Sequence, residues 1–390
     1  MKVLLAFDKF KDALPASEIC AVAARAVRSR YPSADCDECP LTDGGDGFVR
    51  ILTQAAAGRL DPVRVTGPRG VEVAAEYGLV AHGAIPARAS GHIAAGGAGR
   101  GIGGEVAVIE MAACSGLALL APSDRDPWFA TSRGTGEMMS LVAEREVSAI
   151  ILGVGGSASS DLGLGALEAL GFSFRGASGE FISPHPANWT LIARIERPPR
   201  RAFPPVFIAC DVDNPLCGPR GAAAVYGPQK GLRREDVERF DREAARVGGM
   251  LCGVCGVEPE LMNLPGAGAA GGIAFGLMAA LGARILRGSE FVADWLGLRE
   301  RIAAADVVLT GEGCFDASSL TGKGPGAVVG AARAAGRPVH VFAGRVVGEP
   351  AAWLHAISPD DLPTADALAQ TARRLDEVIR SVPLDRGVPR

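Results

Sequence analysis

The chain has 390 residues, of which 48% are hydrophobic and 22% are charged, and these proportions exclude a disordered or fibrous protein. Because one hydrophobic core seldom grows beyond about 300 residues, we expect two domains, or one domain with a large insertion. A formal net charge of −4, with arginines scattered along the chain, argues against a nucleic-acid or membrane-surface partner.

The first residues and the cysteines indicate the compartment. The apolar run after Met1 reaches Asp8 too early for a signal peptide or a membrane span, and Gly, Arg or Asp interrupts every other apolar stretch. Nine cysteines, an odd number, fit a reducing compartment better than a disulfide framework. Two C-x-x-C pairs, at residues 36–39 and 252–255, lie too far apart in the sequence to predict a shared zinc site. We therefore expect a cytoplasmic protein.

The chain opens with the pattern strand, helix, strand, helix. Residues 3–6 are a compact apolar run, and residues 17–29 carry apolar side chains at helical spacing. The second strand ends at the glycine-rich turn 41–47, after which residues 48–52 resume a helical pattern. This order is typical of the start of a Rossmann-like parallel sheet.

The middle of the chain predicts a second α/β unit. Residues 149–152 and 206–209 are short apolar strands, each followed by a polar, glycine-containing loop. Residues 82–104 are rich in glycine and alanine without periodicity, which predicts a mobile surface loop.

The last ninety residues return to the pattern of the first. Strands are predicted at residues 306–310 and 339–343, with a helix at 326–335 between them. We therefore expect an α/β fold in which residues 1–65 and 295–390 form a Rossmann-like domain. Residues 66–294 would form a second α/β domain inserted into it.

Charged residues follow the first two predicted strands. Asp8 and Lys11 stand where open α/β sheets place ligand groups, although Asp8 is also a good turn residue. Asp43 and Asp46 flank two glycines, and two carboxylates there can hold a divalent ion or accept a proton from a substrate hydroxyl. The alternative is a tight turn without a metal.

A glycine-rich loop at residues 153–161 joins a strand to a helix, the layout that points backbone N–H groups at a phosphate. It lacks the G-K-[ST] ending of a P-loop. A second hydroxyl-rich helix start at residues 131–137 contains Thr135, and its alternative interpretation is a capping box.

Two further loops carry acids and lysines. Asp211, with Asp213 and Asn214, offers oxygen ligands suited to magnesium, or a turn before Pro215. Residues 310–325 combine two acids, several hydroxyls and a lysine in one glycine-rich loop, which suits a polyphosphate and its metal.

The whole chain resembles the type I glycerate kinases. That family carries eight motifs in order, a D-x-F-K start, D-G-G-[ED]-G, T-S-x-G-T-G-E, G-x-G-G-S-A-x-x-D, A-C-D-V-x-N-P-L, G-P-Q-K-G, P-G-A-G-A-A-G-G and T-G-E-G-x-x-D-x-x-S-x-x-G-K-x-P. All eight are present here, at residues 8–11, 43–47, 131–137, 153–161, 209–216, 227–231, 265–272 and 310–325. Three positions depart from the usual pattern: Cys314 stands where the family often has arginine, Leu162 replaces a common glycine, and the loop at 82–104 is longer.

The resemblance implies a two-domain α/β kinase with its active site in the interdomain cleft. It implies transfer of the γ-phosphoryl group of ATP, with Mg²⁺, to D-glycerate, usually giving 2-phosphoglycerate. A kinase of another small hydroxy acid, or a binding protein that has lost turnover, remains the alternative. The five histidines lie outside the motifs and are expected to be structural or solvated.

The motif loops and the resemblance together predict the roles of individual residues. Asp43 is predicted as the general base, with Lys323 and Asp316 as further catalytic residues. Substrate binding is predicted for Asp8, Lys11, Asp46 and Lys230, and metal binding for Asp211 and Glu312. Nucleotide or phosphate binding is predicted for Gly155, Gly156, Ser157, Asp161, Thr135, Gly311, Gly313 and Ser319.

Overall fold

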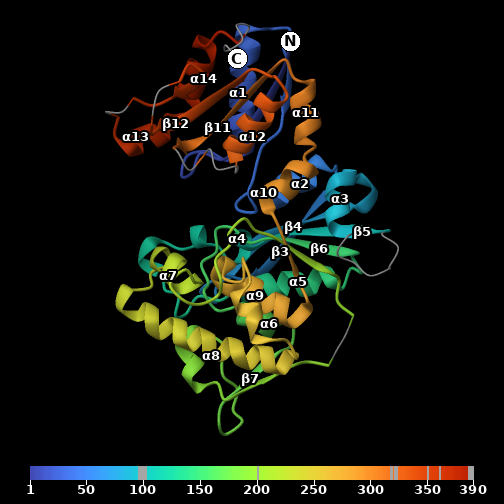
Figure 1. Ribbon diagram of the computed structural model, residues 1–390, viewed down its shortest axis with the longest axis vertical. Helices are drawn as coiled ribbons and strands as arrows, with labels where there is room; N and C mark the ends of the chain where they lie inside the picture. The colour runs from blue at the N-terminus through green and yellow to red at the C-terminus, as the bar shows by residue number, and fades with distance from the viewer. Residues whose placement is uncertain are drawn as a thin grey trace. The chain divides into compact units, whose positions relative to one another are not determined.

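Figure 1 shows the computed structural model of the chain. It describes residues 1–94, 103–199, 202–316, 319, 324–348, 351–359 and 362–384. Contacts divide the chain into two compact units, the first made of residues 1–43 and 292–390 and the second of residues 44–291. The division expected from the sequence differs from this one at residues 44–65 and 292–294.

The first unit contains a five-stranded parallel sheet with the order β13-β12-β11-β1-β2. In Figure 1 the blue N-terminal strand β1 lies beside the orange C-terminal strands of this sheet. In chain order the strands are arranged 2-1-3-4-5, a doubly wound order. Their bounds are β1 Lys2–Phe7, β2 Asp35–Glu38, β11 Val307–Phe315, β12 Val339–Val346 and β13 Leu354–Ala356.

Helices cover both faces of this sheet, so its central strand β1 and the first half of β11 are almost continuously apolar, whereas the edge strand β2 is not buried. Helices α1 and α14 pack together over one face, with Ile19, Leu375 and Ile379 in the same core as Val3 and Leu5. Helices α11 and α12 contact β1 as well. The helix bounds are α1 Ala16–Arg30, α11 Leu298–Ala304, α12 Gly324–Ala334, α13 Thr364–Ala369 and α14 Thr371–Ser381.

The second unit contains a six-stranded sheet with the order β10-β9-β6-β5-β4-β3. Strands β10, β9, β6 and β5 are parallel, whereas β4 pairs antiparallel with both β5 and β3. The bounds are β3 Arg59–Thr66, β4 Glu72–Ala81, β5 Glu105–Glu110, β6 Ala149–Gly153, β9 Val206–Ala209 and β10 Arg284–Leu286. A separate antiparallel pair is formed by β7 (Ser173–Arg175) and β8 (Arg194–Glu196).

One large hydrophobic core fills the second unit, built from the sheet and from helices α5, α6, α8 and α9. Trp189 and Phe240 contribute fully buried rings whose centroids lie 5.1 Å apart. The helix bounds are α2 Phe48–Ala55, α3 Ala87–Ala94, α4 Met111–Ser115, α5 Arg133–Ala143, α6 Leu164–Ala169, α7 Ala222–Tyr226, α8 Val237–Cys255 and α9 Ala269–Leu281. Helix α10, Gly288–Trp295, contains the point where the two units divide.

The predicted α/β fold with mostly parallel strands is confirmed, and each predicted strand and helix named above is present. The prediction of a loop throughout residues 82–104 was wrong, because residues 87–94 form helix α3, with Ala89 and Ile93 buried on one side. Residues 95–102 lie outside the described part of the chain. No helix of the described residues is both long enough and apolar enough to cross a membrane.

Candidate functional site

Three carboxylates of the first unit, those of Asp8, Asp43 and Glu312, interact near the carboxyl end of β1. Asp8 follows β1 and donates its backbone N–H to Gly311 of β11 at 3.0 Å, next to Glu312. Residues 39–41 run beside the end of β1, since Leu41 donates its N–H to the carbonyl of Phe7 at 2.8 Å. They carry the chain toward Asp43. In a 2-1-3-4-5 sheet the point between β1 and β11 is where the strand order reverses and ligands bind.

The environment of Asp8 favours a neutral carboxyl. Burial, followed by the negative charge of Asp43 and then that of Glu312, raises its pKa from 3.8 to about 7, against the opposing effect of Lys9. Burial also raises the pKa of Glu312, whose Oε1 atom is buried without a hydrogen-bond partner among the described residues. Close carboxylates that repel one another favour a cation or a proton between them.

The loop after β11 is organised by Asp316 and Ser319. Asp316 donates its N–H to the hydroxyl of Ser319 at 3.1 Å, and Ser319 donates its N–H back to Oδ1 of Asp316 at 3.3 Å. Gly311 has no room for a side chain, because a Cβ there would stand 1.8 Å from the carbonyl oxygen of Phe342. Gly313 packs beside the backbone of Phe10 and Lys11. The side chain of Lys11 is exposed. Lys323 lies outside the described residues.

In the second unit, the turn that carries Asp46 packs against the glycine-rich loop after β6. Gly155 donates its N–H to the carbonyl of Gly44 at 2.9 Å. A Cβ at Gly155 would stand 2.6 Å from the backbone of Gly45, so only glycine permits this approach. Gly156 is exposed, has a φ of +70° and lies close to the Asp46 carboxylate. The structure therefore joins two predicted motifs.

Glu110, which belongs to none of the eight motifs, holds this turn in place. The carboxylate lies at the end of β5, is 7% exposed, and accepts the N–H groups of Gly47 and Val49 at 3.2 Å each. It therefore satisfies donors at the start of helix α2. In the sequence, this role is indicated only by the position of Glu110, an acid at the end of a buried apolar strand.

Asp161 is buried and accepts four hydrogen bonds from the protein itself. Ser132 donates its N–H and its hydroxyl at 2.8 Å each, and Gly163 and Gly165 donate their N–H groups at 3.1 and 3.2 Å. Thr135 is also fully buried, and its hydroxyl lies 3.1 Å from that of Ser115. These contacts indicate that Asp161 and Thr135 stabilise the fold. Their binding of phosphate, predicted from the sequence, stays a prediction.

The capping box that was the alternative interpretation of residues 131–137 is not formed at the start of α5, where longer-range contacts take its place. The hydroxyl of Ser132 binds Asp161 and does not cap its own helix. Glu137 instead accepts the N–H and the hydroxyl of Thr66, at 2.7 and 2.9 Å. Both side chains thus fasten the helix to neighbouring segments of the second unit.

Lys230 is buried and reaches the same glycine-rich loop. Its ammonium donates to the hydroxyl of Ser157 at 2.8 Å and to the carbonyl of Ser159 at 2.6 Å. Burial lowers its pKa from 10.5 to about 7, although Asp161 partly opposes the shift. Residues of the 265–272 motif close the loop from another side, because a Cβ on Gly271 would stand 2.2 Å from the Ser159 carbonyl oxygen.

Asp211, predicted as a metal ligand, already holds the start of helix α10. Its two carboxylate oxygens accept the N–H and the hydroxyl of Ser289 at 2.8 and 3.1 Å. Asn214 is engaged as well, since it donates to the carbonyl of Arg220 at 2.7 Å and accepts the hydroxyl of Tyr226 at 2.6 Å. Asp211 belongs to the second unit and Glu312 to the first, and the metal role of this pair stays a prediction.

The predicted residues thus fall into two groups, one in each unit. The first unit holds Asp8, Lys11, Asp43, Gly311, Glu312, Gly313, Asp316 and Ser319, and the second holds Asp46, Thr135, Gly155, Gly156, Ser157, Asp161, Asp211 and Lys230. Two surface pockets of the second unit, with volumes of about 360 and 470 Å³, contain none of these residues. Each unit therefore holds its own group of candidate residues in its motif loops.

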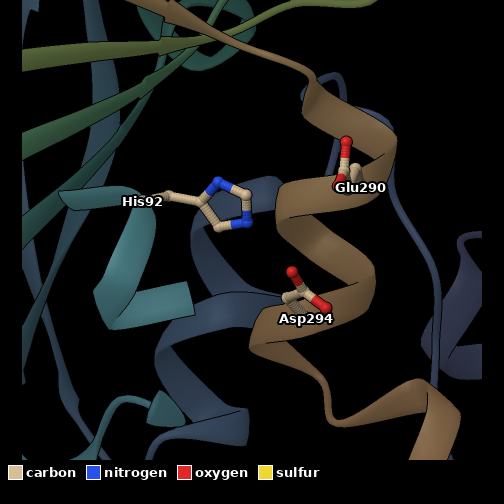
Figure 2. Close-up of side chains that lie close together, drawn as sticks. All are labelled: His92, Glu290 and Asp294. Carbon is tan, nitrogen blue, oxygen red and sulfur yellow. The ribbon is translucent and has the colours of Figure 1, made fainter. Parts of the chain in front are cut away.

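Figure 2 shows a further group of possible metal ligands, His92 of α3 with Glu290 and Asp294 of α10. Each side chain offers one ligand atom, and these atoms lie within 4.8 Å of one another. Glu290 is exposed, and none of the three belongs to a motif loop. Exposed acidic groups commonly gather without a metal, so we assign this group no role. All nine cysteines are free thiols.

Comparisons with known proteins extend these observations over the whole chain. Residues 3–383 match the model of the glycerate kinase family. A glycerate kinase of Bacillus subtilis is 34% identical over 98% of this chain and 97% of its own, and the glycerate 2-kinase of Escherichia coli is 36% identical over 90% and 86%. A crystal structure from Salmonella typhimurium, assigned as a glycerate kinase 2, matches with a TM-score of 0.76 and 36% identity, covering 98% of this chain and 96% of its own.

Proposed function

The chain belongs to the glycerate kinase family, and on that premise we propose that it transfers the γ-phosphoryl group of ATP to D-glycerate, with 2-phosphoglycerate as the product. The observation that supports this most is the group of Asp8, Asp43 and Glu312 at the switch point of a doubly wound sheet. Phosphorylation of a hydroxyl requires a base that accepts its proton, and the polyphosphate of ATP requires a cation. One carboxylate can act as the base, and others can bind the cation.

The side chains of this group fit a magnesium ion. Mg²⁺ prefers oxygen ligands, and Glu312 presents a buried carboxylate oxygen without a protein partner among the described residues. The residues that would hold the ion are Glu312 and Asp211, the two metal ligands predicted from the sequence. When bound, the ion would neutralise charge on the phosphates of ATP.

The remaining residues divide the work of binding and proton transfer. We propose that Asp43 accepts the proton of the attacked glycerate hydroxyl, while Asp8, Lys11 and Asp46 contribute to substrate binding. Gly156 and Ser157 would offer N–H groups to phosphate oxygens, since Gly156 is exposed. Gly155 would contribute to the same phosphate site through the backbone of the loop, because its own N–H is donated to the carbonyl of Gly44. Lys323 would stabilise negative charge on the transferred group, and Asp316 is the further catalytic residue predicted from the sequence.

One assay tests the proposal. The purified protein is mixed with ATP and Mg²⁺ and with a panel of hydroxy acids that includes both enantiomers of glycerate and longer aldonates. ADP formation is followed by a coupled reaction, and the product is identified by NMR. We expect D-glycerate to be converted to 2-phosphoglycerate. ATP consumption only with another acid would refute the substrate, and 3-phosphoglycerate would refute the site of transfer.

A further inference from the structure

Lys230 is a basic residue whose side chain is almost completely buried. It is 5% exposed, and no other lysine or arginine in the described part of the chain is buried to this degree. Removing a cation from water is costly unless hydrogen bonds or an opposite charge compensate it. We therefore expect the hydrogen bonds of the Lys230 ammonium to be important enough to offset the cost of burying it.

Within the described residues, both hydrogen bonds of the Lys230 ammonium reach the glycine-rich loop 153–161. Its ammonium binds the hydroxyl of Ser157 at 2.8 Å and the carbonyl of Ser159 at 2.6 Å, more than seventy residues away in the sequence. Asp161 is the acid that acts on its pKa, but the oxygens of that carboxylate already accept the four protein donors described above. Lys230 thus binds the loop itself and not a paired carboxylate.

Apart from Asp161, the loop has few side-chain anchors among the described residues. The hydroxyls of Ser159 and Ser160 are buried and have no hydrogen-bond partner in the part of the chain that the structure describes. Ser157 is 8% exposed and follows Gly156, which is exposed. Lys230 therefore contacts the loop from the interior, one residue away from the backbone that is open to solvent.

We propose that Lys230 is a positioning residue that fixes the shape of loop 153–161 for the phosphates of the nucleotide, and that it does not bind glycerate itself. The inference rests on the proposed role of this loop in phosphate binding. It replaces the direct substrate contact predicted for Lys230 from the sequence. Backbone N–H groups bind an anion well only when their directions are fixed beforehand.

The test is Lys230→Met, which keeps the length of the side chain and removes its donors. The Ser159 carbonyl then loses its buried partner, and backbone amides in the loop should exchange with solvent faster. We expect the KM for ATP to rise about tenfold, equivalent to roughly 1.4 kcal/mol, with the KM for D-glycerate changed less than twofold. Hydrogen exchange measured by mass spectrometry on the peptide containing residues 153–161 provides the second readout.

Ser157→Ala is the milder matched variant, because it removes one of the two contacts and leaves the lysine in place. It should show the same changes to a smaller degree, and it decides the question if Lys230→Met does not fold. Unchanged exchange in the loop would overturn the inference, and so would a raised KM for D-glycerate with a normal KM for ATP. Wild-type protein without glycerate kinase activity would refute the proposed function instead, while hydrogen exchange would still test the contact.

Discussion

Asp161 accepts both the backbone N–H and the hydroxyl of Ser132 on a single carboxylate oxygen, at 2.8 Å each. Ser132 precedes helix α5 and Asp161 precedes helix α6, so this pair fastens the starts of two helices to each other. The Ser132 hydroxyl also accepts the N–H of Ala166 at 3.0 Å. The arrangement leaves the carboxylate fully occupied by protein donors.

Asp161→Asn should therefore destabilise the fold. The amide replaces one acceptor oxygen by a donor that faces N–H groups, so at least one buried N–H loses its partner. We expect the free energy of unfolding to fall by about 2–3 kcal/mol in urea titrations. Ser132→Ala, which keeps the backbone donor, should cost about 1 kcal/mol. A variant with normal stability and a raised KM for ATP would instead support the phosphate contact predicted from the sequence.

Leu162 provides a separate test of the same loop. The residue has a φ of +58°, a conformation that glycine adopts freely, and its side chain is 1% exposed in the core of the second unit. The family resemblance places a common glycine at this position. The buried Leu162 side chain therefore stabilises the core, whereas its left-handed backbone conformation destabilises the fold.

Comparing Leu162→Gly with Leu162→Ala separates the two effects. Both variants lose the buried side chain, but only glycine relieves the strain. Leu162→Gly should be about 1 kcal/mol more stable than Leu162→Ala, although both should be less stable than the wild type. Thermal unfolding of the two variants under one condition measures the difference. Equal stability, or a more stable alanine variant, would show that the left-handed backbone carries no strain here.

Asp161 and Leu162 show what the sequence could and could not predict. Apolar runs correctly predicted the strands, because burial on both faces leaves a clear pattern, and glycines marked the loops between them. The pattern does not reveal whether Asp161 faces a ligand or the protein, since both roles use an acid in a glycine loop. Glu110 binds a turn 63 residues earlier in the chain, a contact that no local spacing encodes.

Two other features depended on long-range pairing. Strand β3 joins the sheet of the second unit through its antiparallel pairing with β4, so residues 44–65 cluster with that unit. Helix α3 is short, and its two buried side chains, Ala89 and Ile93, give too weak a helical period for a glycine- and alanine-rich segment to be recognised.

His355 predicts a pH dependence of stability in the first unit. Its Nε2 lies 3.0 Å from Nδ1 of His340, and its ring stacks on Phe342 with 4.9 Å between centroids. Burial, followed by the neighbouring His340, lowers the pKa of His355 from 6.5 to about 4. The unfolded chain therefore binds the proton more readily. The stability that this shift contributes is complete above pH 6.5 and is lost as the pH falls toward 4.

His355→Gln keeps a polar partner for His340 but cannot titrate in this range. The wild type should lose on the order of 1 kcal/mol more stability than the variant between pH 7.5 and pH 4.5, after allowance for the partial exposure of the ring. Urea titrations at the two pH values give the difference directly, and subtraction removes the contribution of the carboxyl groups. Parallel losses in both proteins would exclude the histidine pair as the cause.

Lys323→Ala should weaken catalysis more than folding. A lysine in a glycine-rich loop is suited to neutralise charge on the transferred phosphoryl group, and removing one such contact typically costs about a hundredfold in rate. We expect kcat/KM to fall by roughly that factor with an unchanged melting temperature. Lys2→Ala, on the first strand, is the control for loss of one positive charge. Normal kcat/KM in Lys323→Ala would indicate a solvated surface lysine.

The identity of the general base can be decided between Asp43 and Asp8. Asp43 is exposed, follows β2 and lies beside glycines, whereas Asp8 is partly buried and has a pKa raised to about 7 by burial and by Asp43. Asparagine at either position keeps the shape and removes the basicity. If Asp43 is the base, Asp43→Asn should lose about 10²- to 10⁴-fold in kcat while its KM for D-glycerate stays near that of the wild type.

Asp8→Asn is the matched comparison, because it removes a charge from the same group. If Asp8 holds the substrate or the metal, its asparagine variant should raise the KM for D-glycerate, or the concentration of Mg²⁺ needed for half-maximal rate, more than it lowers kcat at saturation. The thermal stability of both variants should be near that of the wild type or higher, because each substitution reduces the repulsion between carboxylates that lie close together. A wild-type kcat in Asp43→Asn, together with a kcat loss in Asp8→Asn that saturating Mg²⁺ and D-glycerate do not restore, would transfer the role of base from Asp43 to Asp8.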